Sequence, residues 1–187
     1  MFDAIVEAEG DETVQAVIIR GSGKLFSARA DIGEFAEPEQ EPGLSALIDR
    51  IESCSKPVVA ATHGNCLGGG LELAMGCHYR VAARNSRMAL PEVTLGLLPG
   101  AGGTQRLPGL VGVAKALDKI MTESAIAAEQ ALEMGLVDLL ADDGNIAAVA
   151  SEFARSLSGA RRTRDIEHDL VITRGNRLGS EMQRLLA

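Results

Sequence analysis

Residues 56–77, K-P-V-V-A-A-T-H-G-N-C-L-G-G-G-L-E-L-A-M-G-C, decide the fold of this chain. The run 56–62 is apolar and β-branched, which is typical of a buried strand in a parallel sheet. Three glycines follow at 68–70, and Leu71 to Met75 continue as a predicted helix. Because glycine lets a ligand approach the backbone, and because the first N–H groups of a helix lack intrahelical partners, this junction suits an oxyanion.

The same alternation of strands and helices extends along the chain and predicts an α/β fold with parallel pairing. Strands are expected at 15–20, 56–62, 79–83 and 136–141, and helices at 43–53, 71–75, 104–112, 114–121, 127–135 and 146–157. We expect one domain over residues 1–160 and a charged, helical tail over 161–187.

Composition narrows the class of protein. The 187 residues suit one domain with a sizeable core, and the formal net charge of −8 argues against nucleic acid as a partner. No apolar run is long enough to span a bilayer, and the acidic start lacks the pattern of a secretory signal. Three cysteines without C-x-x-C spacing indicate neither a disulfide framework nor a zinc site. A cytoplasmic location follows as the default expectation.

Two glutamates are candidates for acid–base chemistry. Glu72 follows the three glycines, and Glu92 lies twenty residues further along in an apolar stretch. A carboxylate in apolar surroundings needs a partner, and two acids in different environments form a possible acid–base pair. The structural alternatives stay open: glycines that serve close packing, a glutamate that favours a helix start, and a turn residue after Pro91.

Two further motifs have both a functional and a structural interpretation. Residues 26–31, F-S-A-R-A-D, follow the first strand, where parallel sheets bind ligands, although an ordinary surface turn fits equally. Gly64, Cys66 and Gly68 form G-x-C-x-G between a strand and a helix, as in the nucleophile elbow of a hydrolase. A buried structural cysteine is the alternative at Cys66.

Together, three stretches resemble the crotonase superfamily, the enoyl-CoA hydratase/isomerase family. They are F-S-A-R-A-D-I at 26–32, the run 56–77, and L-P-E-V-T-L-G-L-L-P-G-A-G-G-T-Q-R-L at 90–107. The sequence of these stretches is most similar to the hydratase portion of multifunctional β-oxidation proteins, which carry a 3-hydroxyacyl-CoA dehydrogenase as well. The resemblance implies a crotonase-like spiral of ββα units that binds an acyl-CoA thioester.

The family's roles transfer to matching positions. The resemblance implies an oxyanion hole made by the N–H groups of Ala30 and Gly69, catalytic acids at Glu72 and Glu92, and an N–H of Gly100 that helps to hold water. It also implies that coenzyme A, as part of the substrate, is bound by Ala28, Asp31, Ile32 and Gly69. No metal or redox cofactor is expected, and the family pattern suggests a homo-oligomer, a trimer or a hexamer.

The sequence departs from the family pattern at two places. Arg29 stands where the family usually has glycine, one residue before Ala30. The chain also begins at the family's first helix, without the strands that usually precede it, so the first strands are expected to be missing. We therefore expect an exposed sheet edge, covered by a partner subunit or a rearranged tail.

The expected function is hydration of trans-2-enoyl-CoA to 3-hydroxyacyl-CoA in fatty-acid β-oxidation. The alternatives are isomerisation of 3-enoyl-CoA to 2-enoyl-CoA on the same scaffold and a catalytically silent acyl-CoA-binding or assembly subunit. A cysteine hydrolase based on Cys66 is the remaining alternative.

Overall fold

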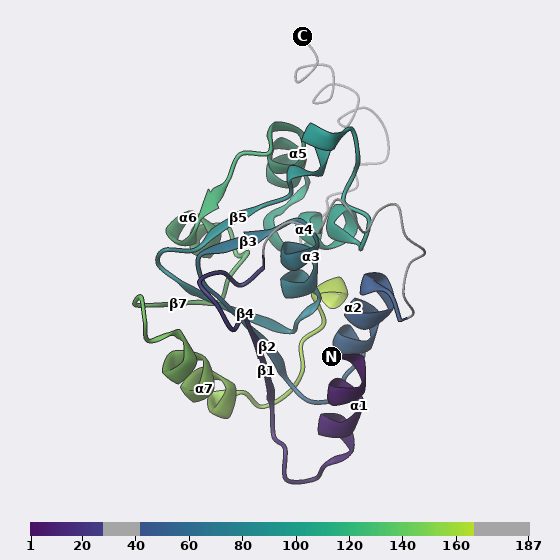
Figure 1. Cartoon of the computed structure of the whole chain (residues 1–187), viewed down its shortest axis with the longest axis vertical. Coiled ribbons are helices and arrows are strands. Elements are labelled where there is room, and N and C mark those ends of the chain that lie inside the picture. The colour runs from purple at the N-terminus through teal and green to yellow at the C-terminus, as the bar shows by residue number, and fades with distance from the viewer. Residues whose placement is uncertain (28–41, 167–187) are drawn as a thin grey trace.

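A computed structural model describes residues 1–27 and 42–166 of the chain (Figure 1). Its elements in chain order are α1 (Phe2–Gly10), β1 (Val17–Arg20), α2 (Leu44–Glu52), β2 (Val58–Thr62), β3 (Asn65–Leu67), α3 (Gly69–Gly76), β4 (Tyr79–Ala83), β5 (Arg87–Ala89), the 3-10 helix η2 (Pro91–Leu95), α4 (Gly103–Val111), α5 (Val113–Thr122), β6 (Ile126–Ala127), α6 (Ala128–Glu133), β7 (Leu139–Ala141), α7 (Ile146–Ser156) and the 3-10 helix η3 (Thr163–Asp165).

The strands form two sheets. A four-stranded parallel sheet has the order β1-β2-β4-β7, and a three-stranded sheet has the order β3-β5-β6. Strands β3 and β5 are parallel, β6 is antiparallel to β5, and Ser27 makes a parallel bridge to Cys66 beside them. Thus β2-β3-α3 and β4-β5-α4 are consecutive ββα units, as the predicted spiral requires.

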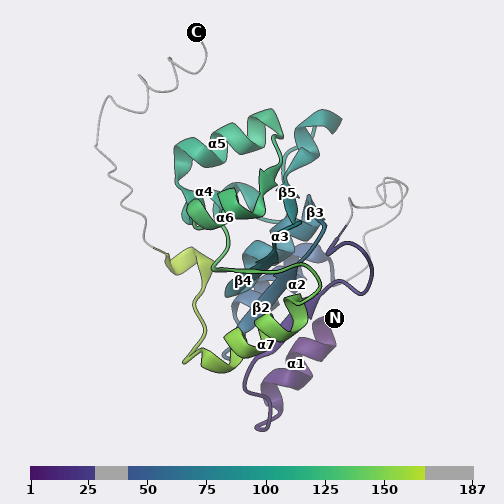
Figure 2. The same cartoon turned by 90° about the vertical axis from the view of Figure 1, so that its left-hand side faces the viewer.

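Helices cover both faces of the larger sheet. Residues of β2 alternate between two cores: Val58 and Ala60 pack in the main core, whereas Val59 and Ala61 pack in the second core with residues of α7. Figures 1 and 2 show α7 along one face of this sheet, with α2 and α3 on the other. All five residues of β2 are buried, which explains its uninterrupted apolar sequence.

Among the described residues, β1 is an outer strand of the larger sheet and pairs with β2 alone. Whether a partner subunit or the tail covers this edge stays a prediction. Within the described tail, Thr163 is buried and its hydroxyl donates to the carbonyl of Met75 at 2.8 Å. Residues 167–187 lie outside the described residues, so a helical tail also stays a prediction. In the part of the chain that the structure describes, no helix combines the length and apolar character of a membrane span.

The predicted strand at 136–141 is wrong in its first half, because only Leu139–Ala141 pair in the sheet. Gly135, with φ +80°, lies just past the end of α6, and the next two N–H groups, of Leu136 and Val137, both donate back to the carbonyl of Ala131. These amides therefore close the helix end and do not join the sheet. The short strands β3, β5 and β6 were not predicted.

A buried histidine joins α2, β2 and the end of α3. The N–H of Val58 donates to Nδ1 of His78 at 3.0 Å, so Nε2 carries the ring proton and faces the Glu52 carbonyl at 3.2 Å. Since the side chain is fully buried and one ring nitrogen must accept, this fold requires neutral imidazole. Burial lowers the pKa of His78, against weaker opposing effects from its hydrogen bonds.

We expect stability to fall as the pH is lowered from about 6.5 to about 5, by up to about 1.4 kcal/mol per pH unit. The pKa of His78 is lower in the folded chain than in the unfolded chain, so the unfolded state takes up the proton first. Denaturant unfolding at a series of pH values measures this slope. Glu9 and Glu52, whose pKa values are lowered to about 2, contribute their own loss only below about pH 4.5.

The His78→Asn variant is expected to lose this slope between pH 6.5 and 5, because asparagine keeps an acceptor without titrating. His63→Asn, which replaces a half-buried histidine whose Nε2 faces the Gly23 carbonyl, is the matched control and should keep it. An unchanged slope in the His78→Asn variant contradicts the assignment.

Candidate active site

The start of α3 is built around Gly68. Its N–H donates to the carbonyl of Ala89 at 2.9 Å, and its own carbonyl accepts from Leu71 and Glu72 at 2.8 and 3.0 Å. The backbone there has φ +54° and ψ −129°, a conformation that favours glycine. A Cβ at this position would lie 3.1 Å from Oε1 of Glu92. Glycine therefore allows the helix start and the Glu92 carboxyl to touch.

Gly70 allows close packing, and Gly69 lies at a partly exposed helix start. A Cβ on Gly70 would lie 2.3 Å from Cβ of Ser27, so α3 rests directly on the last described residue before the 28–41 stretch. Gly69 is the first residue of α3 and is partly exposed. Its N–H belongs to the helix turn that has no intrahelical acceptors. Close packing is thus observed at Gly70, whereas a role of the Gly69 N–H in binding an oxyanion stays a prediction.

Glu72 is a buried carboxylate held by main-chain amides. Its side chain is 3% exposed, and Oε1 accepts from the N–H groups of Ala101 and Gly103, both at 2.8 Å. These amides lie at the start of α4, whose positive dipole end favours a negative charge. A Cβ on Gly103 would lie 3.0 Å from the same oxygen, so glycine lets the backbone come this close.

Glu92 approaches the same helix start from η2. It lies in the first turn after Pro91, is half-buried, and its Oε1 faces Gly68, the residue that caps the helix bearing Glu72. The structure therefore brings Glu72, Glu92 and Gly69 together around one helix terminus. Their catalytic roles stay predictions.

The remaining predicted site residues divide into two groups. Gly100 lies in the exposed loop between η2 and α4, directly before Ala101. Ala30, the second predicted donor of the oxyanion hole, lies outside the described residues. So do Arg29 and three of the predicted coenzyme A contacts, Ala28, Asp31 and Ile32. The sequence analysis missed the amides of Ala101 and Gly103, although the glycines before α4 were a signal that backbone groups approach something closely.

The structure contradicts a nucleophile elbow at Cys66 and supports the alternative, a buried structural cysteine. Cys66 lies inside β3 with no exposed surface, and burial raises the pKa of its thiol. A nucleophile elbow would instead hold the thiol on an exposed turn. Such an enzyme would also need a histidine as base, but His78 is fully buried with both ring nitrogens facing backbone groups, and His168 lies outside the described residues. Within 1–27 and 42–166, no cluster of three or more His, Cys, Asp or Glu side chains suits a metal ion.

Comparisons with known proteins identify the family and several relatives of this chain. Residues 1–165 match the family model described as Enoyl-CoA hydratase/isomerase. The peroxisomal bifunctional enzyme of Danio rerio is 51% identical over 152 residues, which make up 81% of this chain and 21% of that protein. The probable enoyl-CoA hydratase of Bacillus subtilis (strain 168) is 49% identical over 144 residues, or 73% of this chain and 56% of that protein.

Solved structures confirm the predicted crotonase-like fold. The enoyl-CoA hydratase from Bacillus anthracis superposes with a TM-score of 0.76 at 36% identity, covering 82% of this chain and 62% of that chain. An enoyl-CoA hydratase subunit from Geobacillus kaustophilus HTA426 gives a TM-score of 0.77 at 34% identity with the same coverage. The chain therefore spans about a fifth of the Danio rerio relative and just over half of the Bacillus subtilis relative.

The geometry at Gly68 predicts a specific loss of stability. In the Gly68→Ala variant, alanine must adopt a φ that is unfavourable for it, and its Cβ presses on the Glu92 carboxyl. We expect these two effects to lower the free energy of unfolding by about 1–3 kcal/mol. Gly23→Ala is the matched control, because a Cβ there meets no heavy atom within 4 Å. Equal unfolding midpoints for the two variants in urea would show that the described backbone at Gly68 is incorrect.

Proposed function

The chain belongs to the enoyl-CoA hydratase/isomerase family, and we propose that it hydrates trans-2-enoyl-CoA to 3-hydroxyacyl-CoA in fatty-acid β-oxidation. The observation that carries the proposal is the pair of carboxyls at the start of α3. Glu72 is fixed by two amides at 2.8 Å, and Glu92 lies against the capping Gly68. Two carboxyls beside a helix N-terminus can supply both proton transfer and stabilisation of negative charge.

In the proposed reaction, water lies between Glu72 and Glu92. One carboxylate accepts a proton from the water while the water oxygen bonds to Cβ of the enoyl group, and a proton is delivered to Cα. The C–C double bond becomes single, and the product carries the hydroxyl on Cβ. The Gly100 N–H is proposed to help hold the attacking water.

Negative charge builds on the thioester oxygen as water attacks. We assign its stabilisation to the N–H groups of Gly69 and Ala30, which together would form an oxyanion hole. Loss of one such donor in other enzymes lowers the rate by about 10²–10³-fold. Coenzyme A would be held, as part of the substrate, by Ala28, Asp31, Ile32 and Gly69.

The proposal includes neither a metal nor a redox cofactor, because addition of water changes no oxidation state overall. A homo-oligomer, a trimer or a hexamer, is the proposed assembly. The cytoplasmic location inferred from the cysteine pattern stays a prediction, while the names of relatives from Danio rerio and Arabidopsis thaliana assign those proteins to peroxisomes.

We expect the protein to convert crotonyl-CoA to 3-hydroxybutyryl-CoA, measured by loss of the enoyl thioester absorbance and by identification of the product. Glu72→Gln and Glu92→Gln should each lower kcat by about 10²–10⁴-fold, the usual contribution of a positioned acid or base. Glu129→Gln, which alters an exposed glutamate paired with Arg84, is the control and should keep the wild-type rate.

Three outcomes separate the alternatives. Turnover that persists at the wild-type rate in the Glu92→Gln variant contradicts the assignment of that residue. A shifted double bond from a 3-enoyl-CoA substrate without hydration of crotonyl-CoA identifies an isomerase. Calorimetric binding of acetoacetyl-CoA without turnover of either substrate identifies a silent binding subunit.

A further inference from the structure

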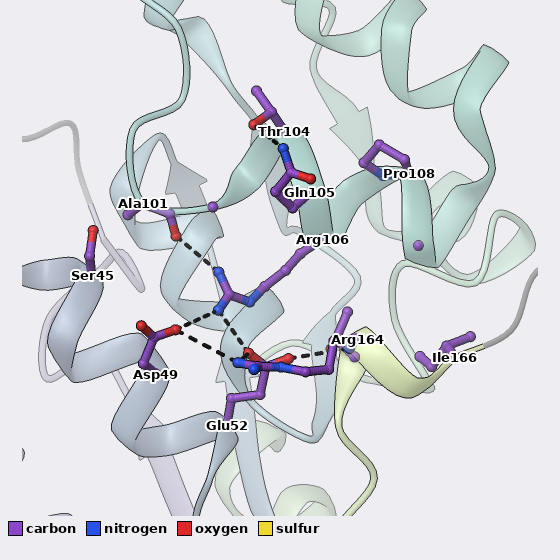
Figure 3. Close-up of a pocket in the computed structure, with 13 residues that line it drawn as sticks. Ser45, Asp49, Glu52, Ala101, Thr104, Gln105, Arg106, Pro108, Arg164 and Ile166 are labelled. Carbon is purple, nitrogen blue, oxygen red and sulfur yellow. Dashed lines mark hydrogen bonds and ion pairs between the residues drawn. The ribbon is translucent and has the colours of Figure 1, made fainter.

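The two amides that hold Glu72 flank a peptide group that an arginine side chain holds. The N–H groups of Ala101 and Gly103 donate to Glu72 Oε1, both at 2.8 Å. Between them, the carbonyl of Ala101 accepts from Nη1 of Arg106 at 3.0 Å. Figure 3 shows the Arg106 side chain reaching back from α4 to this carbonyl. Three consecutive peptide groups are therefore bound alternately to the carboxylate and to the guanidinium.

Glycine at 102 makes this contact possible. A Cβ on Gly102 would lie 2.1 Å from Nη1 of Arg106, and the residue has φ +93°. The backbone N–H of Arg106 also donates to the carbonyl of Gly102 at 2.9 Å, in the first turn of α4. Arg106 thus holds the loop through both its main chain and its side chain.

The guanidinium is itself held by α2. Its Nη2 donates to Oε2 of Glu52 at 2.8 Å and to Oδ1 of Asp49 at 3.2 Å. Arg106 is 9% exposed and Glu52 is 1% exposed, so this ion pair is shielded from solvent. A planar guanidinium can bind a carboxylate and a carbonyl at once with little freedom to move.

Glu52 is also bound from the tail, by Arg164. The side chain of Arg164 forms an ion pair with Glu52 Oε2, and its backbone N–H donates to Oε1 at 3.2 Å. Burial alone would raise the pKa of Glu52, but hydrogen bonds from Arg164 and Arg106 outweigh it and lower the pKa to about 2. The carboxylate that orients Arg106 therefore stays charged at neutral pH.

We propose that Arg106 is a positioning residue for Glu72, acting by fixing the Ala101 carbonyl so that the amides of Ala101 and Gly103 keep the Glu72 carboxylate in place. The expected effect on kcat rests on the proposed function. The expected effect on the position of the two amides rests on the hydrogen bonds alone. Arg106 takes no part in proton transfer. Its polar contacts run to α2 and to the loop before α4.

The Arg106→Gln variant tests this role. We expect kcat on crotonyl-CoA to fall about tenfold with KM changed by less than about twofold, because one charge-assisted hydrogen bond to the loop is lost while substrate contacts stay. In the Glu72→Gln background, the same substitution should lower the residual kcat by less than twofold, since both changes act through one carboxylate. A full tenfold loss of kcat in that background would mean that the two substitutions act independently, and it would overturn the proposal.

Hydrogen exchange gives a readout that does not need turnover. The N–H groups of Ala101 and Gly103 should exchange faster in Arg106→Gln than in the wild type, with global stability compared by denaturant unfolding. Arg106→Lys serves if the glutamine variant folds poorly, because it keeps a positive charge opposite Glu52 but lacks the two-pronged donor. If the free energy of opening at both amides, obtained from their exchange rates, falls by no more than the free energy of global unfolding, the proposal is overturned.

Arg84→Gln is the matched control. Arg84 is 54% exposed and pairs with Glu129 and Asp142 on the surface, so its loss should change neither kcat nor exchange at Ala101 and Gly103. If the wild-type protein fails to hydrate crotonyl-CoA, the proposed function fails, while the exchange comparison still decides whether Arg106 positions the loop.

Discussion

A buried carboxylate must be satisfied by hydrogen bonds, and the site follows from how Glu72 meets this requirement. Burying an unpaired charge is strongly unfavourable, so a 3% exposed carboxyl requires donors close by. The N–H groups of Ala101 and Gly103 supply them at 2.8 Å, and glycines in that loop allow the approach. This interaction joins the start of α3 to the start of α4, which belong to consecutive ββα units.

The spiral arrangement of the units explains why residues from distant stretches meet. Strands β2 and β4 are neighbours in the larger sheet, and β3 and β5 are neighbours in the smaller one. The chain therefore turns into α3 beside the end of β5, where Gly68 donates to the Ala89 carbonyl and η2 begins shortly after. Glu92 reaches the same helix terminus from η2. The pairing of these strands and the helices that follow them thus set the relative position of the two carboxyls.

The sequence was most informative where a hydrophobic pattern stands next to residues that the backbone conformation requires, such as glycine. The apolar run of β2 and the triple glycine predicted a buried strand and a helix start, and both are present; the glycines are closely packed against neighbouring side chains, as one of the two interpretations expected. The short strands were missed because three residues or fewer carry too little periodicity. The Ala101 amide was missed because backbone donors leave no side-chain signature. Arg106 was missed because its role depends on Glu52, which is 54 positions away in the chain and comes near because α2 and α4 both pack on α3.

The central claim is that both carboxyls border one thioester site at the N-terminus of α3. A crystal structure with acetoacetyl-CoA tests it most directly. The account predicts the thioester oxygen about 2.7–3.1 Å from the Gly69 nitrogen, with the carboxyls of Glu72 and Glu92 both lining the space beside the acyl carbons. A thioester bound away from this helix terminus, or a Glu72 carboxyl on the opposite side of α3 from the acyl group, would contradict it.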